Sequence, residues 1–293
     1  MSDLIRRSKN KLKLKVANLW SLVRLKNKAR IEIPILCYHS INHQNSFEAD
    51  PLSPDLFEVH LCHLYNNYNV ISLHEALGFI ELGYCDVENP VVITFDDGYI
   101  DNYEVAFPLL KKYQAPATIF LVTGFINRKL VLIDDSFFGP LTWEQISEMD
   151  KSNLITFGAH TDNHKILSKI SEAEVVDEII KSKTELEARL KHEVNLFAYP
   201  NGQRSDIPNF GGRILKENGF LCACSTMWRS NHKRDERWNI NRIMVSGDDT
   251  LEVFSSKVLG DFDYIYFLHN VKFFVKKVSN FIYTPTESNS YER

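Results

Sequence analysis

The chain has 293 residues, of which 44% are hydrophobic and 25% are charged, and its formal net charge is −4. This composition is typical of a globular protein with one large or two modest domains. The charge is unevenly distributed, because residues 1–30 contain ten basic side chains and one acidic side chain. The remaining residues are therefore net acidic, which excludes a general nucleic-acid-binding protein, and we expect no nucleic-acid partner.

The N-terminal extension, residues 1–30, contains a short apolar stretch from Val16 to Val23 that basic residues flank. No small-residue cleavage site follows it, so we expect a cytoplasmic chain rather than a secreted one. On a helix, five apolar side chains would share one face: Leu12, Val16, Leu19, Trp20 and Val23. A basic amphipathic helix of this kind can contact the inner face of the membrane peripherally. A solvated helix packed on the domain, or a disordered tail, is the alternative.

From about residue 31 onward, apolar β-branched runs alternate with amphipathic stretches. The expected strands are, in chain order, Ile33–Tyr38, Val91–Phe95, Ala117–Val122, Leu154–Gly158, Asn195–Tyr199, Phe220–Thr226 and Arg242–Ser246. Helices are expected over 53–68 and 100–113, after the capping box of Ser171 and Glu174, and around 264–277. This alternation indicates parallel βαβ units in a single catalytic domain, residues 31–283, followed by a polar tail, residues 284–293.

Asp96, Asp97 and Gly98 directly follow the second expected strand. In parallel α/β folds the carboxyl ends of the strands meet at one rim, where the chemistry is located. Two adjacent carboxylates are costly to bury without partners, and a metal ion would offset that cost. Gly98 allows a sharp turn, so that one carboxylate can bind a metal while the other stays free as a base. By itself the tripeptide is equally typical of an ordinary turn.

His160 and His164 follow the fourth expected strand with a spacing of four residues. Side chains at this spacing lie on the same side of a helical turn and can share one cation. Two imidazoles and one carboxylate form a common catalytic site for zinc or a similar divalent ion. Together with one carboxylate of the Asp96–Asp97 pair, the two histidines predict a metal centre.

Two further segments end at the same rim. His39, just after the first strand, is positioned to act as a proton donor or is a hydrogen-bonded rim residue. The turn of Tyr199, Pro200 and Asn201 offers backbone amides to a developing oxyanion, or is only a turn. The five cysteines have no zinc-ribbon spacing, so we expect small buried thiols in a reducing compartment.

Together these motifs resemble the polysaccharide deacetylase family, the nodulation-protein-B-like carbohydrate esterases. Thr94–Tyr99 resembles the first family motif, His160–His164 the second, and Ala198–Gly202 the third. The resemblance extends from about residue 33 to about residue 260. It implies a distorted (β/α)7 barrel that holds one divalent metal ion, usually zinc.

Carried over residue by residue, the resemblance makes Asp97, His160 and His164 the metal ligands and Asp96 the general base. An amide of the Tyr199–Asn201 loop would assist in holding the oxyanion. The chain departs from the common family pattern at Ala198, where an arginine is usual. It also lacks the C-terminal Leu-x-His motif that usually supplies the general acid.

The chain more closely resembles the subgroup that includes the poly-N-acetylglucosamine deacetylases. There the general acid is the histidine of an N-terminal Tyr-His motif, which is His39 here, and His269 is the alternative. We therefore expect an enzyme that removes N-acetyl groups from an amino-sugar glycan or glycan precursor and releases acetate. Hydrolysis of another amide, a ureide or an O-acetyl ester stays open, as does a catalytically silent sugar-binding domain.

Overall fold

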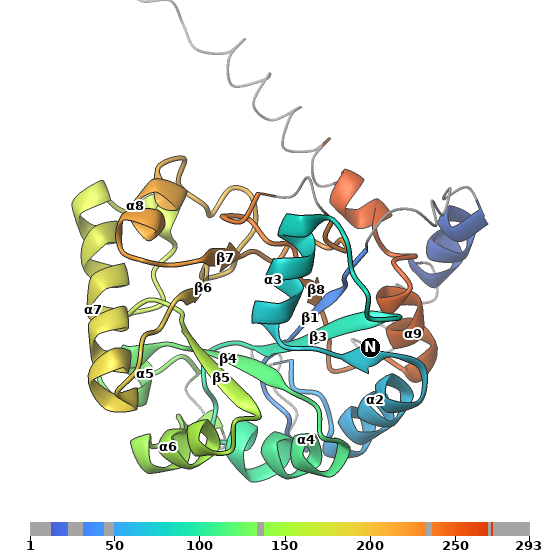
Figure 1. Cartoon of the computed structure of the whole chain (residues 1–293), viewed down its shortest axis with the longest axis horizontal. Coiled ribbons are helices and arrows are strands. Elements are labelled where there is room, and N and C mark those ends of the chain that lie inside the picture. Colours follow the sequence, from blue (N-terminus) through green and yellow to red (C-terminus); the bar gives the residue numbers. More distant parts are fainter. Residues whose placement is uncertain are drawn as a thin grey trace, which may run out of the picture.

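A computed structural model of the protein describes residues 13–22, 32–43, 50–133, 138–232, 236–268 and 271. Its centre is a parallel sheet with the strand order β7-β6-β5-β4-β3-β1-β8, which curls into a half-barrel (Figure 1). The strands are β1 (Ile35–Tyr38), β3 (Pro90–Phe95), β4 (Ala117–Leu121), β5 (Ile155–Ala159), β6 (Leu196–Ala198), β7 (Cys222–Cys224) and β8 (Ile243–Met244), and β2 (Asn69–Val70) pairs with β3 beside this path. Each of the seven expected strands is therefore present, with bounds that differ by a few residues.

Parallel pairing places the carboxyl ends of all these strands at one edge. Ile35 of β1 lies opposite Val92 of β3, and Tyr38 lies opposite Phe95. β3 pairs with β4, and β4 with β5, in the same direction. The residues that follow β1, β3, β5 and β6 consequently meet at this edge, although they are far apart in the sequence.

Helices surround the convex face of the sheet (Figure 1). They are α2 (Pro54–Asn67), α4 (Phe107–Tyr113), α6 (Trp143–Lys151), α7 (Glu172–Leu190), α8 (Gly211–Glu217) and α9 (Leu251–Val258). The short helix α5 (Thr123–Ile126) and the 3-10 turn η3 (Leu167–Lys169) lie in the connections after β4 and β5. The predicted capping box at the start of α7 is present, because Ser171 accepts from the amide of Glu174 and the Glu174 side chain accepts from the amide of Ser171.

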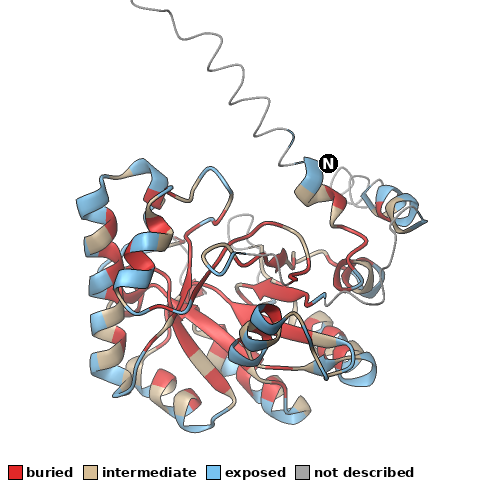
Figure 2. Ribbon diagram, turned by 45° about the horizontal axis from the view of Figure 1, so that its top comes forward, coloured by how far each residue is buried: buried red, intermediate tan, exposed pale blue. Residues whose placement is uncertain are grey.

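Helix α3 (Leu73–Leu82), which the sequence analysis did not predict, packs on the other face of the sheet. Leu73 and Ile80 of this helix belong to a buried cluster with Ile35, Val92 and Leu196 of the strands. Alternate strand residues, such as Leu36 and Ile93, belong instead to the larger cluster under the outer helices. The sheet is therefore buried on both faces, which Figure 2 shows as its continuous red strands.

Two sequence predictions need correction. The helix expected over 100–113 is divided into a π-turn, η1 (Asn102–Ala106), and α4, which starts at Phe107. Pro108 explains the division, because proline has no amide hydrogen and its ring clashes with the carbonyl four residues earlier. The expectation of buried thiols holds for Cys37, Cys222 and Cys224, but it is wrong for Cys62, which is exposed on α2.

The helix over residues 13–22 packs on the domain through Ala17, which is fully buried against Val253 and Phe262. Leu19 and Leu22 on the same helix are 64% and 82% exposed. Within the described ranges, no helix combines the length and the apolar character that crossing a bilayer requires. The rest of the extension and the tail over 284–293 lie outside the described residues.

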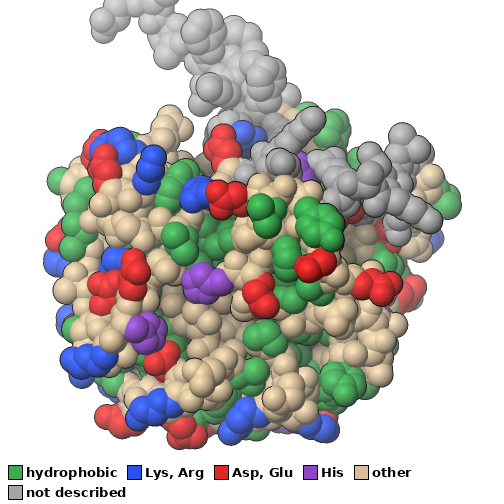
Figure 3. All heavy atoms as spheres, in the orientation of Figure 1, with side chains coloured by type: hydrophobic (Ala, Val, Ile, Leu, Met, Phe, Trp, Pro, Cys, Tyr) green, Lys and Arg blue, Asp and Glu red, His purple; other side chains and the backbone are tan. Residues whose placement is uncertain are grey.

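On the face of the domain shown in Figure 3, Lys and Arg side chains are interspersed with Asp and Glu side chains. On α7, charged side chains form local pairs, as Arg189 does with Glu185 and Lys181 with Asp177 one helical turn away. Such exposed pairs contribute little to stability. The buried interior described above therefore dominates the free energy of folding.

A buried ion pair joins α9 to the loop that follows β8. Lys257 Nζ lies 2.5 Å from Asp249 Oδ2 and also donates to the carbonyl oxygen of Met244. Substituting Lys257 by methionine leaves the Asp249 carboxylate buried without its cation, so we expect the free energy of unfolding to fall by about 3–5 kcal/mol. Equilibrium urea denaturation measures this loss. The exposed Lys181, paired with Asp177, provides the control, and an equal loss in Lys181→Met would contradict the prediction.

Candidate active site

Asp97, His160 and His164 converge at the carboxyl ends of β3 and β5. The Nε2 atoms of His160 and His164 lie 3.7 Å and 3.5 Å from Oδ1 of Asp97. Asp97 Oδ1 is buried and has no hydrogen-bond partner among the described residues. A buried carboxylate oxygen that faces two imidazoles is costly unless a cation completes the site, so the three residues fit a divalent metal ion.

His160 is held in the form that binds a metal. Its Nδ1 lies 2.8 Å from the carbonyl oxygen of Ala198 in β6. Because a carbonyl oxygen only accepts hydrogen bonds, Nδ1 carries the proton, and the lone pair of Nε2 is directed at Asp97. Burial lowers the pKa of His160 to about 4, although the carboxylates of Asp96 and Asp97 oppose the shift. The imidazole is therefore neutral near pH 7, as metal ligation requires.

The backbone turns sharply where the first motif leaves β3. Asp97 and Gly98 both have left-handed backbone angles, with φ of +74° and +85°. A Cβ atom at position 98 would lie 2.6 Å from Leu121 Cδ2, and this contact together with the left-handed φ favours glycine there. This turn lets the side chains of Asp96 and Asp97 face different partners, as the sequence analysis expected.

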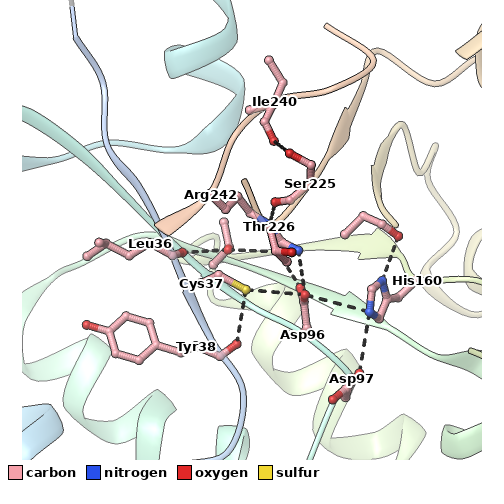
Figure 4. Close-up of polar contacts among 12 residues, drawn as sticks. Leu36, Cys37, Tyr38, Asp96, Asp97, His160, Ser225, Thr226, Ile240 and Arg242 are labelled. Atoms are coloured by element: carbon pink, nitrogen blue, oxygen red, sulfur yellow. Dashed lines mark hydrogen bonds and ion pairs between the residues drawn. The ribbon is translucent and has the colours of Figure 1, made fainter. Parts of the chain in front are cut away.

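Asp96 is paired with Arg242, a residue that the sequence analysis placed at the start of a strand without giving it a role. The Nη1 and Nη2 atoms of Arg242 each lie 2.6 Å from a different oxygen of Asp96. The Arg242 side chain also donates to the carbonyl oxygen of Ser225 and to Oγ1 of Thr94. Both charged side chains are almost completely buried, and Figure 4 shows Asp96 between Arg242 on one side and His160 and Asp97 on the other.

This ion pair determines the charge of Asp96. Burial alone would raise the pKa of the Asp96 carboxyl, but the Arg242 guanidinium, with help from His160, lowers it well below its usual range. Arg242 uses one lone pair on each oxygen and Cys37 Sγ uses the second one on Oδ2, so one lone pair of Oδ1 stays available. Asp96 therefore stays ionised and can still accept a proton, which suits the predicted general base.

A second group of candidate ligands, Cys37, His39 and Asp96, also lies within 4.8 Å of one another. Burial raises the pKa of the Cys37 thiol well above its usual value, and Cys37 Sγ donates to Asp96 Oδ2 at 3.5 Å. A dication at this position would meet the guanidinium of Arg242 and a neutral thiol. The electrostatics therefore favour the cluster of Asp97, His160 and His164 as the metal site.

His39, the predicted general acid, lies on a short segment after β1 that Asp101 and Asn102 hold in place. The Asn102 side chain donates to the backbone carbonyl of His39 at 2.9 Å. Ser40 Oγ donates to the Asp101 carboxylate at 2.5 Å. Burial raises the pKa of Asp101 to about 6, and the hydrogen bond from Ser40 limits the rise. The alternative acid, His269, lies outside the described residues.

The three residues of the predicted oxyanion loop differ in whether their backbone amides are available to a ligand. The amide of Tyr199 donates to the carbonyl of Cys224, and Pro200 has no amide hydrogen. The Tyr199 side chain is 1% exposed and packs against Phe197 in the core. Within the described part of the chain, the Asn201 amide has no hydrogen-bond acceptor, and Asn201 is the only one of the three loop residues that lines the pocket.

These groups open into a pocket of about 710 Å³. The candidates for the acid, the base and the metal ligands all line it, namely His39, Asp96, Asp97, His160 and His164. The apolar part of the lining consists of Tyr99, Leu132, Ile133 and Met244. The remaining polar part consists of Asn201, Gln203, Asp206 and Thr226. A pocket with both kinds of lining can hold a sugar ring, whose faces are apolar and whose hydroxyl groups are polar. The structure therefore brings five of the predicted site residues into one cavity together with Asn201.

Comparison with known proteins identifies the family. The family profile for polysaccharide deacetylases matches residues 84–220. A Bacillus subtilis protein whose name assigns it to the polysaccharide deacetylases is 32% identical over 223 residues, which cover 76% of this chain and 74% of the relative. The chain belongs to the polysaccharide deacetylase family. The family, the deacetylase class and the barrel fold expected from the sequence are thereby confirmed.

Two further relatives are informative. The poly-β-1,6-N-acetyl-D-glucosamine N-deacetylase of Staphylococcus aureus is 30% identical over 170 residues, which are 54% of this chain and 55% of that protein. The chain thus spans about half the length of that relative. The structure of the Streptococcus pyogenes deacetylase PplD in complex with acetate is similar with a TM-score of 0.69 and 27% identity, over 78% of this chain and 99% of that chain.

Substitution of Arg242 tests its control of Asp96. In Arg242→Met the Asp96 pKa rises, because burial is then no longer opposed by the guanidinium, so the acidic limb of the pH profile of kcat/KM should move to higher pH. At pH 7 we expect a loss on the order of 10²-fold. Arg242→Lys keeps the charge and should retain part of the activity. The control is Arg237→Met, which breaks only the surface pair with Glu81. An unshifted acidic limb in Arg242→Met would contradict this role.

Proposed function

We propose that this polysaccharide deacetylase uses one zinc ion to hydrolyse the acetamide groups of a poly-N-acetylglucosamine-like glycan. The observation that carries the proposal is the joint placement of the Asp97, His160 and His164 cluster and the Asp96–Arg242 pair in one pocket. The staphylococcal relative, whose name gives that substrate, supports the choice of glycan. Two nitrogen donors and one carboxylate oxygen favour zinc among the common divalent ions.

Asp97, His160 and His164 would hold the ion, which when bound would acidify a water molecule and polarise the amide carbonyl. Asp96, kept ionised by Arg242, accepts the proton from the attacking water. The Asn201 amide is free to donate to the oxygen that becomes negative. His39 gives a proton to the departing nitrogen, because an amide nitrogen leaves poorly as an anion. The products are acetate and a free amino sugar.

The alternatives to this function are hydrolysis of a different substrate and sugar binding without catalysis. Other amides, ureides and O-acetyl esters would use the same pocket, and no contact in it discriminates among them. A catalytically silent sugar-binding domain has no need for a set of metal ligands beside a buried carboxylate–guanidinium pair, because both are costly to bury. The geometry therefore favours an enzyme over a binding module.

Acetate release tests the function and its metal requirement together. We expect release from N-acetylglucosamine oligomers, loss of activity after chelation, and recovery with zinc. Asp96→Asn should lower kcat on the order of 10²–10⁴-fold while metal content is unchanged, because Asp96 is not a ligand. His160→Ala should lose metal and activity together. Normal turnover in Asp96→Asn would refute the role of Asp96 as general base. Faster hydrolysis of O-acetyl esters or ureides would show that these compounds, and not the glycan, are the substrates.

We further infer a cytoplasmic enzyme that contacts the inner face of the membrane through residues 1–30. The ten basic side chains of that segment and the exposed Leu19 and Leu22 support this inference. Deletion of residues 1–30 should abolish co-sedimentation with vesicles that contain anionic lipid, and binding should weaken with salt. Deacetylation of a short soluble oligomer serves as the control and should be unchanged. Equal sedimentation of both forms would refute the inference.

A further inference from the structure

The loop that carries His164 has an unfavourable backbone conformation. Thr161 and His164 both have left-handed angles, with φ of +68° and +53°. Such angles are uncommon for residues other than glycine, and for a β-branched residue such as threonine they are outliers. A conformation of this kind persists only where neighbouring groups fix it. The contacts that fix this loop therefore decide where the His164 imidazole lies.

One side of the loop is held by α5. The amides of Thr123 and Gly124 donate to the carbonyls of Thr161 and Asp162, at 3.3 Å and 2.7 Å. Thr123 Oγ1 donates to the Asp162 carboxylate at 2.7 Å. A Cβ atom on Gly124 would lie 2.5 Å from the Asp162 carbonyl oxygen, so this approach requires glycine. These contacts fix the first half of the loop, before His164.

The other side is held by a single side chain of α7. Glu178 accepts from the backbone amide of Asn163 at 2.7 Å and from the Asn163 side-chain amide at 2.9 Å. It is 3% exposed, although Lys165 Nζ lies 3.4 Å from it. Of the other buried positions of α7, Val175, Ile179 and Leu186 are apolar, and Ser182 carries only a small hydroxyl group. A buried carboxylate is a costly choice for packing alone, and its two hydrogen bonds go to the residue directly before His164.

We propose that Glu178 is a positioning residue for the metal centre: through Asn163 it holds His164 where its Nε2 faces Asp97 Oδ1. The proposal rests on the metal site of the proposed function. His160 does not depend on this contact, because the Ala198 carbonyl orients its ring. Loss of Glu178 should therefore release one of the three ligands, lowering metal affinity while the other two remain in place.

Cobalt affinity, measured by competition with a chelating dye, tests the proposal without using activity. In Glu178→Gln one carboxylate oxygen becomes an NH₂ group that faces an N–H donor, so one hydrogen bond to Asn163 is lost. We expect the cobalt dissociation constant to rise about tenfold or more and the visible absorption of bound cobalt to change. Glu185→Gln is the matched control, since Glu185 lies half-exposed on the same helix and forms an ion pair with Arg189.

A purely structural role for Glu178 predicts a different result. The metal-free Glu178→Gln protein would then unfold at lower temperature, but its cobalt dissociation constant and spectrum would match those of the unmodified protein, which would overturn the proposal. Glu178→Asp keeps the charge and shortens the side chain by one methylene, so it too should weaken cobalt binding. This variant replaces Glu178→Gln in the test if the glutamine variant does not fold. An unmodified chain that binds no cobalt would overturn the metal site itself and this proposal with it.

Discussion

The guanidinium of Arg242 and the carboxylate of Asp96 meet inside the half-barrel, where both are almost completely buried. Removing two charges from water is costly, and only the bidentate geometry with its further hydrogen bonds to Ser225 and Thr94 offsets the cost. The pair also gives the neighbouring carboxylates of Asp96 and Asp97 different roles. Because Arg242 occupies Asp96 and keeps it ionised, Asp96 is suited to take a proton, and Asp97 is left to face the two histidines.

The strand exits supply the second constraint. The segments that leave β3, β5 and β6 toward the site contain left-handed residues, namely Asp97, Thr161, His164 and Asn201. Strained backbone of this kind collects at functional sites because the surrounding structure must hold it. Here the support comes from neighbouring elements: α5 and α7 hold the loop after β5, and Thr226 Oγ1 donates to the Asn201 carbonyl in the loop after β6. The barrel and its helices thereby hold the side chains on these loops in position.

Much of this arrangement could be predicted because it is encoded locally. Runs such as Val91–Phe95 are β-branched and apolar, which is sufficient to predict buried parallel strands. The spacing of His160 and His164 and the Asp96–Asp97 pair predict a metal centre whose members the structure brings together. Local patterns were less informative for α3, a short helix after a two-residue strand, and for the π-turn before Pro108.

The sequence by itself determined the family and the parallel barrel, and it predicted the ligand triad and the candidate base, since the motifs that carry them are each short and local. The tertiary structure alone decided which groups surround them. Arg242 reaches Asp96 across 146 positions, and Glu178 of α7 accepts from Asn163 in the loop that carries His164. Asn201, rather than the buried Tyr199, lines the pocket. Such contacts depend on how strands and helices pack in three dimensions, and no local spacing encodes them.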